Sequence, residues 1–359
     1  MSQPLTITEC LLDQCRRYPA LEPQDLIKAL HQSVYGCGHL VGAAEEGVGR
    51  IREEMESARG DAAGAEMLAG AYCRLPLAWA RKLGMKAETV FALFAYSART
   101  PSGTAEELEA ALAELEVLAQ AGRLPWTEAA VGQAVQAYRQ AGCPICRHTP
   151  AFHQAYEPAY RVIRREYVWL LPLLGAIDRK RDGTNRLLVA LEGGSASGKT
   201  TLAALLEAVY GCSVFHMDDF FLRPEQRTPE RYAQPGGNVD RERFWQEVLE
   251  PLRRGADTIA YRRYDCQSGR LLEPAAVAVG SMAVVEGAYS LHPDLAPAYD
   301  LRVFLDIDPA LQKARIFRRN VPPQWDRFFD TWIPLEQAYF QSLDPKGQCD
   351  LVLEVEAGR

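Results

Sequence analysis

Eight consecutive residues in the second half of the chain combine three glycines with a lysine and a threonine at a fixed spacing. They are Gly193-Gly194-Ser195-Ala196-Ser197-Gly198-Lys199-Thr200, which fit G-x-x-x-x-G-K-[ST] at every defined position. Glycines let the backbone turn tightly, so that its N–H groups converge on one point where phosphate oxygens can bind. The Lys199 ammonium would reach the outer phosphates, and the Thr200 hydroxyl would ligate Mg²⁺. The pattern therefore predicts a binding site for the phosphate tail of ATP.

The flanking residues place this loop between a strand and a helix. The apolar run Leu187–Leu191 predicts a buried strand, and Thr201–Tyr210 follows with helical periodicity. A chance glycine-rich turn is the alternative, but the pattern defines four positions and lies in the context that phosphate loops occupy. We therefore predict that ATP is bound by Gly193, Ser195, Ala196, Ser197, Gly198, Lys199, Thr200 and Thr201.

Carboxylates follow two more predicted strands. Asp218 comes directly after Ser213–His216, and Glu286 comes directly after Ala283–Val285. Because the carboxyl ends of parallel strands meet at one edge of a sheet, we expect both side chains beside the phosphate loop. Asp218 could accept the proton of an attacking hydroxyl or orient Mg²⁺, and Glu286 could bind the metal directly or through water. A helix N-cap is the alternative role for Asp218.

These segments together resemble a known group of enzymes. The phosphate loop, the block Asp218-Asp219-Phe220-Phe221 and the strand end Val284-Val285-Glu286-Gly287 are similar to those of uridine kinases and nicotinamide riboside kinases. Phosphoribulokinase and bacterial pantothenate kinase are more distant members. The resemblance covers residues 187–356 and implies an α/β P-loop kinase fold, a parallel sheet wrapped by helices. It also implies ATP and Mg²⁺ as cofactors.

The resemblance assigns roles to individual residues. It implies that Asp218 is the catalytic base, that Asp240 holds ribose hydroxyls, and that Tyr261 and Tyr264 lie in the hairpin that contacts the base. Uridine kinases carry a base-reading histidine a few residues further on, where this chain has Cys266-Gln267-Ser268-Gly269.

A predicted lid completes the implied active site. Arg315 and Arg318 match the lid arginines that clamp the ATP phosphates, and they join Asp218 and Lys199 as the implied catalytic residues. The implied Mg²⁺ ligands are Thr200, Glu286 and Asp218.

The insert 223–237 adds Arg223, Arg227 and Arg231. These arginines could contact an anionic substrate, but a solvated loop in which they pair with Glu225 and Glu230 is the favoured interpretation.

The expected activity is ATP-dependent phosphorylation of a hydroxyl on a small metabolite. The resemblance favours a nucleoside or ribosyl compound, and a pantothenate-like or sugar-phosphate acceptor is the alternative. A regulatory ATP-binding module is a third hypothesis. The pair Asp218 and Asp240 favours an enzyme, because a pure switch needs no acceptor site.

The first part of the chain is predicted to be an all-helical domain, with no strand before residue 186. Thr104 and Glu107 form a capping-box pattern, and leucines recur on one helical face after it, at Leu108, Leu112, Leu115 and Leu118. We predict a helical domain over 1–165, a helix and charged linker over 166–186, and a kinase domain over 187–359.

Two clusters in the helical region raise zinc as a possible ligand. Cys37 and His39 form one cluster, and Cys143, Cys146 and His148 form the other. The pattern is incomplete for a zinc finger, so buried cysteines and hydrogen-bonded histidines are favoured. The segment 152–161 mixes aromatic and basic residues, and it predicts either a second ligand site or a packed helix entry.

Composition and charge exclude some classes of protein function. A net charge of −7 argues against general nucleic-acid binding, and no apolar run is long enough to span a membrane. The nine cysteines are scattered with no secretory pattern, which predicts a cytoplasmic protein with reduced thiols. The oligomeric state is not predicted.

Overall fold

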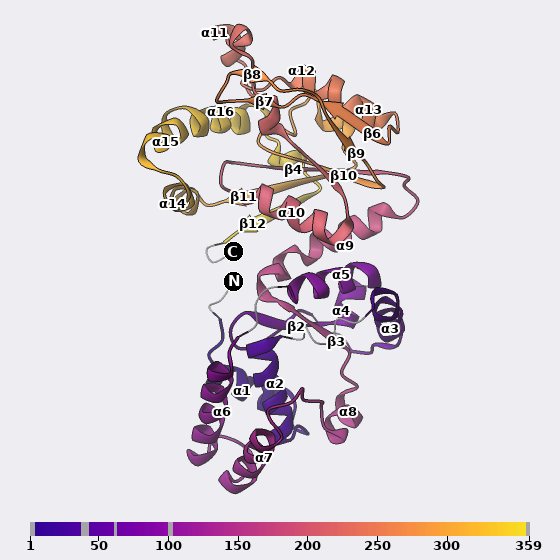
Figure 1. The fold of residues 1–359 in the computed structure, drawn as a ribbon, viewed down its shortest axis with the longest axis vertical. Coiled ribbons are helices and arrows are strands. Elements are labelled where there is room, and N and C mark those ends of the chain that lie inside the picture. Colours follow the sequence, from indigo (N-terminus) through magenta and orange to yellow (C-terminus); the bar gives the residue numbers. More distant parts are fainter. Residues whose placement is uncertain (1–3, 37–42, 61–62, 100–102, 357–359) are drawn as a thin grey trace. The chain divides into compact units, whose positions relative to one another are not determined.

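The computed structural model describes residues 4–36, 43–60, 63–99 and 103–356 of the chain. The chain divides into two compact units, Ser2–Asp178 and Arg179–Arg359, called here the N-terminal unit and the C-terminal unit (Figure 1). The division falls within helix α9 (Leu171–Arg181), which follows a short 3₁₀ segment, Arg165–Leu170.

The C-terminal unit is built on a five-stranded sheet whose paired strands all run parallel. The strand order is β12-β11-β4-β10-β5, so the strand before the phosphate loop lies in the middle. All seven residues of β4 are buried, as expected for a strand covered on both faces. The three strands predicted from the sequence are confirmed as β4 (Leu187–Gly193), β5 (Ser213–His216) and β10 (Met282–Glu286). The sheet is completed by β11 (Leu301–Ile307) and β12 (Leu351–Val355).

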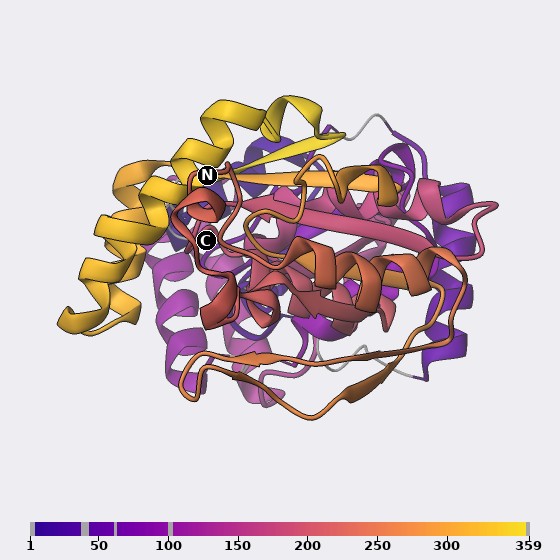
Figure 2. The ribbon, with the colours of Figure 1, turned by 90° about the horizontal axis from the view of Figure 1, so that it is seen from above.

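Helices and two small antiparallel ribbons cover this sheet. The helices include α10 (Lys199–Tyr210), α11 (Pro229–Tyr232), α12 (Arg241–Phe244), α13 (Glu250–Arg253), α14 (Pro309–Arg319), α15 (Pro322–Arg327) and α16 (Ile333–Leu343). The ribbons pair β6 (Thr258–Tyr261) with β9 (Ala275–Ala278), and β7 (Tyr264–Asp265) with β8 (Arg270–Leu271). Figure 2 shows α14, α15 and α16, coloured orange to yellow, gathered on one side of this unit.

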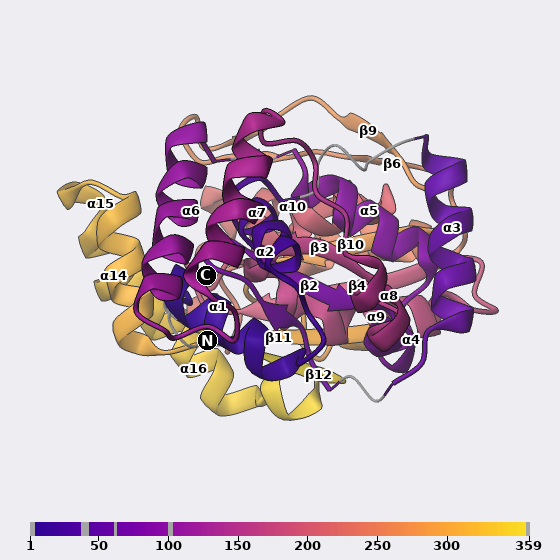
Figure 3. The same ribbon diagram turned by 90° about the horizontal axis from the view of Figure 1, so that it is seen from below.

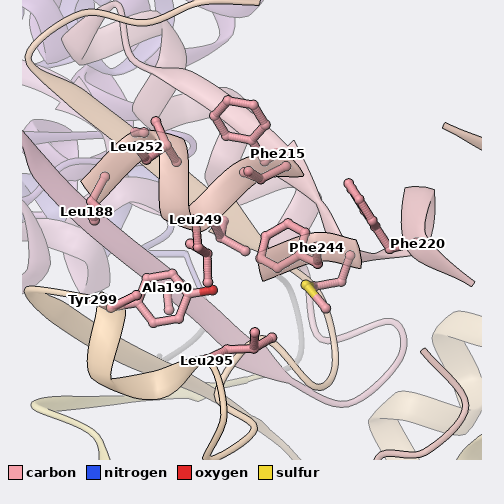
Figure 4. Packing of buried hydrophobic residues seen from close by; sticks show 14 of the residues in the cluster. Leu188, Ala190, Phe215, Phe220, Phe244, Leu249, Leu252, Leu295 and Tyr299 are labelled. Atoms are coloured by element: carbon pink, nitrogen blue, oxygen red, sulfur yellow. The ribbon is translucent and has the colours of Figure 1, made fainter. Parts of the chain in front are cut away.

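The core of the C-terminal unit lies between β4 and the segments that follow Asp218. Figure 4 shows Leu188 and Ala190 of the central strand among aromatic and aliphatic side chains from these segments. The ring of Phe220 stacks on Tyr261 with centroids 5.5 Å apart and meets Phe244 edge-on at 4.9 Å. The Phe220 packing anchors the turn that carries Asp218, because a buried aromatic ring fixes the backbone beside it.

The N-terminal unit is helical, as predicted, and its helices bury a leucine-rich core. The Thr104–Glu107 capping box is present, and Leu108, Leu112, Leu115 and Leu118 are all buried. Figure 3 shows α1, α2, α6 and α7 grouped together. The helices are α1 (Ile7–Arg17), α2 (Pro23–Tyr35), α3 (Ala44–Ser57), α4 (Leu77–Lys82), α5 (Ala87–Ser97), α6 (Ala105–Gln120), α7 (Glu128–Gln140) and α8 (Pro150–Tyr156).

The prediction that no strand precedes residue 186 is wrong. A three-stranded antiparallel sheet joins β1 (Glu66–Met67), β2 (Tyr72–Pro76) and β3 (Tyr160–Arg164). The first four residues of β2 are buried, so the strand shows no alternation of apolar and polar positions. One of them, Arg74, looks like a surface residue in the sequence but is 1% exposed and pairs with Glu66 at 2.7 Å.

Candidate active site

The glycine-rich loop turns directly from β4 into α10. Gly198 caps the helix with φ +102°, and Gly193 ends the strand with φ +145°, both in the region that favours glycine. A Cβ on Gly193 would lie 2.5 Å from the Leu305 carbonyl oxygen on the neighbouring strand. The loop therefore needs glycine at its first position for both conformation and space.

The polar groups of the loop suit a bound phosphate. The buried Lys199 ammonium donates to the carbonyl oxygens of Gly193 at 2.8 Å and Gly194 at 2.9 Å. The buried Ser197 hydroxyl has no hydrogen-bond partner within the described ranges. An unpartnered buried hydroxyl is uncommon and fits a site that a ligand oxygen completes.

A side-chain carboxylate of the protein itself contacts this loop. The Glu336 carboxylate of α16 accepts hydrogen bonds from the Ser195 N–H at 2.9 and 3.1 Å and from the Ser195 hydroxyl at 2.5 Å. Burial raises the pKa of Glu336, while the nearby Lys199 charge and the Ser195 donors oppose that shift. The loop thus binds a negatively charged oxygen pair through an amide that the motif would direct at phosphate.

Oxygen donors for a magnesium ion lie at the start of α10 and the end of β10. The Thr200 hydroxyl donates to Glu286 at 3.1 Å, and His216 Nδ1 lies 2.6 Å from the same carboxylate oxygen. In the described part of the chain, no three His, Cys, Asp or Glu side chains form a metal-binding group. Two hard oxygen donors still fit Mg²⁺, because that ion usually keeps several waters and shares its coordination with substrate phosphates.

Asp218 lies next to these groups, in the 3₁₀ turn that follows β5. Its side chain reaches solvent, but the surrounding protein desolvates the carboxylate and raises its pKa. Lys199 opposes this shift, and Glu286 adds to it. Asp218 therefore interacts electrostatically with Lys199 at the start of α10 and with Glu286 at the end of β10.

The residues predicted to bind the acceptor are engaged inside the protein. Asp240 is 3% exposed, caps α12 by accepting from the Arg243 N–H at 3.1 Å, and accepts from Gln226 at 2.9 Å. The buried Tyr261 donates its hydroxyl to Asp219 at 3.1 Å. Tyr264, also buried, accepts at its hydroxyl from Arg227 at 2.7 Å. The Asp240 carboxylate thus holds an internal turn.

The predicted lid arginines lie on α14. Arg315 donates to the carbonyl oxygens of Ala196 at 3.2 Å and Ser197 at 3.3 Å, so its guanidinium contacts the loop. Burial and the neighbouring Arg318 lower the pKa of Arg315. Arg318 is exposed. Gln312, one turn earlier on the helix, donates to the Ser195 carbonyl oxygen at 2.8 Å.

The arginines of the insert mostly stabilise its own turns. Arg231 pairs with Glu242 at 2.7 Å, and Arg223 pairs with Glu225 at 3.2 Å. The favoured interpretation of a paired loop holds for both, but Glu242 replaces Glu230 as the partner of Arg231.

Sequence reasoning missed three carboxylate or imidazole groups near the loop. Glu192, fully buried beside Gly193, accepts from the N–H groups of Tyr289 at 3.2 Å and Leu291 at 3.0 Å. It also accepts from the Tyr339 hydroxyl at 3.0 Å. A glutamate inside an apolar strand was a signal for this role, and His216 stands two residues before Asp218. Glu336 gave no signal, because it is 141 residues from Ser195 in the sequence.

In the second cysteine–histidine cluster, both ring nitrogens of the histidine make hydrogen bonds within the protein. His148 Nδ1 lies 2.8 Å from Asp25, and its Nε2 lies 2.7 Å from the Tyr160 hydroxyl. Burial lowers the pKa of His148 to about 4. Cys143 and Cys146 pack against the helical core. Cys37 and His39 lie outside the described residues.

Three proteins of known annotation resemble parts of the chain. A bifunctional alpha-galactosidase/sucrose kinase of Mediterraneibacter gnavus is 30% identical over 207 residues, which are 51% of this chain and 21% of that protein. A probable thymidylate kinase of Pyrobaculum aerophilum is 30% identical over 136 residues, 37% of this chain and 70% of that protein. Uridine-cytidine kinase A of Dictyostelium discoideum is 24% identical over 194 residues, 49% of this chain and 39% of that protein.

No protein-family model matches the chain. The solved structure of a possible uridine kinase from Bacillus stearothermophilus is 21% identical with a TM-score of 0.37, and the match covers 50% of this chain and 99% of that one.

A parallel sheet whose central strand leads through a glycine loop into a helix defines a P-loop kinase architecture here. The chain belongs to the P-loop kinases, because the probable thymidylate kinase is 30% identical to it and is matched over 70% of that protein's length. About half of the chain is similar to a uridine-cytidine kinase. The chain spans 21% and 39% of two of its relatives. Among the described helices, none is both long and apolar enough to cross a membrane.

Proposed function

We propose that this chain transfers the γ-phosphoryl group of ATP to a hydroxyl of a small metabolite. The observation that carries the proposal is the arrangement at the ends of β5 and β10: Thr200 bonds to Glu286 at 3.1 Å, Glu286 is the strand partner of His216, and Asp218 follows two residues later. These groups adjoin a loop that already binds a carboxylate. A phosphate site, a cation and a solvent-accessible carboxylate in one cluster are the parts that phosphoryl transfer needs.

The loop and the lid would bind and neutralise the phosphate tail. The Ser195 N–H and the Ser197 hydroxyl offer donors, while Lys199 and Arg315 supply positive charge on two sides of the loop. Such donors are most effective when they are fixed before the reaction, because no reorganisation is then needed as charge develops. The proposed lid, residues 315–323, would exclude water and so limit ATP hydrolysis.

Asp218 would hold and deprotonate the acceptor hydroxyl. Its raised pKa brings the carboxylate nearer to neutral pH, which suits a general base. Thr200 and Glu286 would hold Mg²⁺, which when bound supplies positive charge between the outer phosphates. Tyr261 fixes the neighbouring Asp219, so the turn that carries both aspartates is braced from one side.

A nucleoside or ribosyl compound is the acceptor class that we propose first. It follows from the Asp-Asp-Phe-Phe block and from the similarity to a uridine-cytidine kinase. Because Asp240 is engaged by Gln226 and Arg243, a ribose would have to displace the Gln226 contact to reach it.

A sugar is the second candidate acceptor. The relative from Mediterraneibacter gnavus is described as a sucrose kinase, and the internal bonds of Asp240 leave Asp218 as the solvent-accessible acid. A sugar hydroxyl needs only that acid and the in-line phosphate, so this acceptor requires no rearrangement at Asp240.

A screen of acceptors tests the proposal. The full chain would be incubated with Mg²⁺, ATP labelled at the γ-phosphate, and a panel of nucleosides, nicotinamide riboside, free sugars, sugar phosphates and pantothenate. Transfer of label to one class identifies the acceptor. Transfer only to sugars would replace the nucleoside assignment. Tight ATP binding with no transfer to any member would contradict the enzyme and favour a regulatory module.

A further inference from the structure

A cavity of about 290 Å³ lies within the N-terminal unit, formed entirely by residues of that unit. Its walls come from helices α2, α3 and α5, from the segment before α8, and from the start of β3. The lining side chains that carry the argument are Lys28, Arg50, Glu54, Arg147, Tyr160 and Arg161. This wall includes part of the segment 152–161, for which the sequence predicts either a second ligand site or a packed helix entry.

Positive charge dominates the cavity wall. Four of its side chains are lysine or arginine, and Glu54 is its only acid among the lining residues of the described structure. Arg161 pairs with Glu54 through two hydrogen bonds of 2.7 and 3.0 Å, which neutralises one of the four cations. Arg50 bonds to Glu46, but that pair is largely exposed and so contributes little. The cavity therefore carries an excess of positive charge.

Arg147 and Lys28 provide the cations best placed for a ligand. Within the described ranges, the exposed Arg147 side chain makes no hydrogen bond or ion pair. The Lys28 ammonium donates to the carbonyl oxygen of Cys146, the residue before Arg147, at 2.9 Å. A guanidinium fork and an ammonium on the wall of one cavity are groups that bind phosphate oxygens well.

The remaining wall suits a compact organic body. Phe91, Phe94, Ile51 and Val162 supply an apolar side. On the polar side, the Tyr160 hydroxyl is fixed by Gln32 at 3.1 Å and by His148 at 2.7 Å. A few fixed polar groups on a partly apolar wall are typical of small-molecule sites, and 290 Å³ lies at the small end of their usual volumes.

We propose that this cavity is a second ligand site, which binds a small phosphomonoester such as a sugar phosphate or a nucleoside monophosphate. The phosphate would contact Arg147 and Lys28, and the organic body would lie against Phe91, Phe94 and Tyr160. The site stands independently of the proposed phosphoryl transfer, because every residue that forms it belongs to the other unit.

Calorimetric titration of the full chain tests the site. The chain would carry Lys199→Ala, so that binding at the phosphate loop is weakened. The probes are ribose 5-phosphate, glucose 6-phosphate, UMP, AMP and inorganic phosphate, each compared with its neutral parent where one exists. We expect at least one organic phosphomonoester to bind, and its neutral parent to bind at least tenfold more weakly.

Two variants locate the binding. Arg147→Ala and Lys28→Met should each weaken the phosphomonoester by about tenfold, because each removes one charge-assisted hydrogen bond. Arg123→Ala, an exposed arginine outside the cavity, should change nothing. Unchanged melting temperatures would show that the variants fold. The proposal is overturned if no organic phosphomonoester binds, if inorganic phosphate binds equally well, or if binding ignores both cavity variants.

Discussion

The carboxylate of Glu336 binds the backbone N–H of Ser195 at 2.9 Å, and so a side chain of α16 occupies a donor of the phosphate loop. The same carboxylate accepts from the Ser195 hydroxyl at 2.5 Å and lies near Lys199. A nucleotide phosphate that used this amide would have to replace Glu336. The contact therefore couples the position of α16 to the occupancy of the loop.

Removal of this carboxylate should tighten ATP binding. In Glu336→Ala the nucleotide no longer competes with a charged hydrogen bond, which is worth about 1.5–3 kcal/mol, so we expect the Kd for ATP to fall by roughly tenfold. Glu336→Gln removes the charge but keeps the shape of the side chain, and it should give part of the increase in ATP affinity. Gln337→Ala, the exposed neighbour, serves as the control. Fluorescence titration with ATP measures the change, and an unchanged or higher Kd in Glu336→Ala contradicts the account.

Lys199 should contribute to both nucleotide affinity and rate. Its ammonium is held by the carbonyl oxygens of Gly193 and Gly194, next to the expected phosphate position. We expect Lys199→Ala to raise the Kd for ATP by about tenfold or more and to lower the transfer rate further, because the charge neutralised in the transition state is larger. Lys346→Ala, which removes an exposed lysine elsewhere in the unit, should leave both unchanged. A Lys199 variant with normal affinity and rate would show that the loop is used differently.

The Thr200 hydroxyl should set the magnesium requirement. Thr200→Val keeps the shape of the side chain but removes the oxygen that bonds to Glu286, so the Mg²⁺ concentration for half-maximal transfer should rise several-fold. Thr200→Ser keeps the hydroxyl and should behave like the wild type. Transfer assays over a series of free Mg²⁺ concentrations give the answer. Equal requirements in Thr200→Val and Thr200→Ser would remove this residue from the proposed metal site.

Glu192 should make the stability of the C-terminal unit depend on pH. Burial raises its pKa from 4.5 to about 7. Between these values the folded chain keeps a proton that the unfolded chain has lost, so the free energy of unfolding falls as pH rises and levels off above about pH 7. Glu192→Gln cannot ionise. Its melting temperature, measured for the transition that ATP shifts, should therefore rise relative to the wild type between pH 5 and pH 8.

A different result of this melting experiment would contradict the prediction. A difference in melting temperature between Glu192→Gln and the wild type that stays constant across this pH range would show that Glu192 does not titrate there. In that case the four hydrogen bonds donated to its carboxylate keep it ionised throughout.

The elements of the C-terminal unit could be predicted because their signals are local. Buried parallel strands appear as short apolar runs, and the phosphate loop is a contiguous pattern between Leu191 and Thr201. In contrast, β2 of the N-terminal unit contains the buried Arg74, and its main partner strand lies almost ninety residues further on. A buried ion pair and a distant strand partner leave no periodic pattern, so the small sheet escaped prediction.

In the candidate site, too, the residues with a local sequence signal were predicted and those that depend on distant contacts were not. Asp218 and Glu286 were found because strand ends of a parallel sheet share one edge. Glu336 was missed because its contact with Ser195 depends on how α16 packs, which no local pattern reports. Asp240 was assigned from resemblance alone, whereas the structure shows its carboxylate as the cap of α12. The contacts of both Glu336 and Asp240 thus depend on tertiary packing, which a local sequence pattern does not report.

The most direct test of the central claim is γ-phosphoryl transfer by Asp218→Asn, measured together with its affinity for ATP. The variant keeps the size of the side chain but cannot accept the hydroxyl proton. We predict an ATP affinity within about twofold of the wild type, and a transfer rate lower by roughly 10²–10⁴-fold, the usual contribution of a general base. A transfer rate close to that of the wild type would contradict the proposed role of Asp218 and the acceptor site built around it.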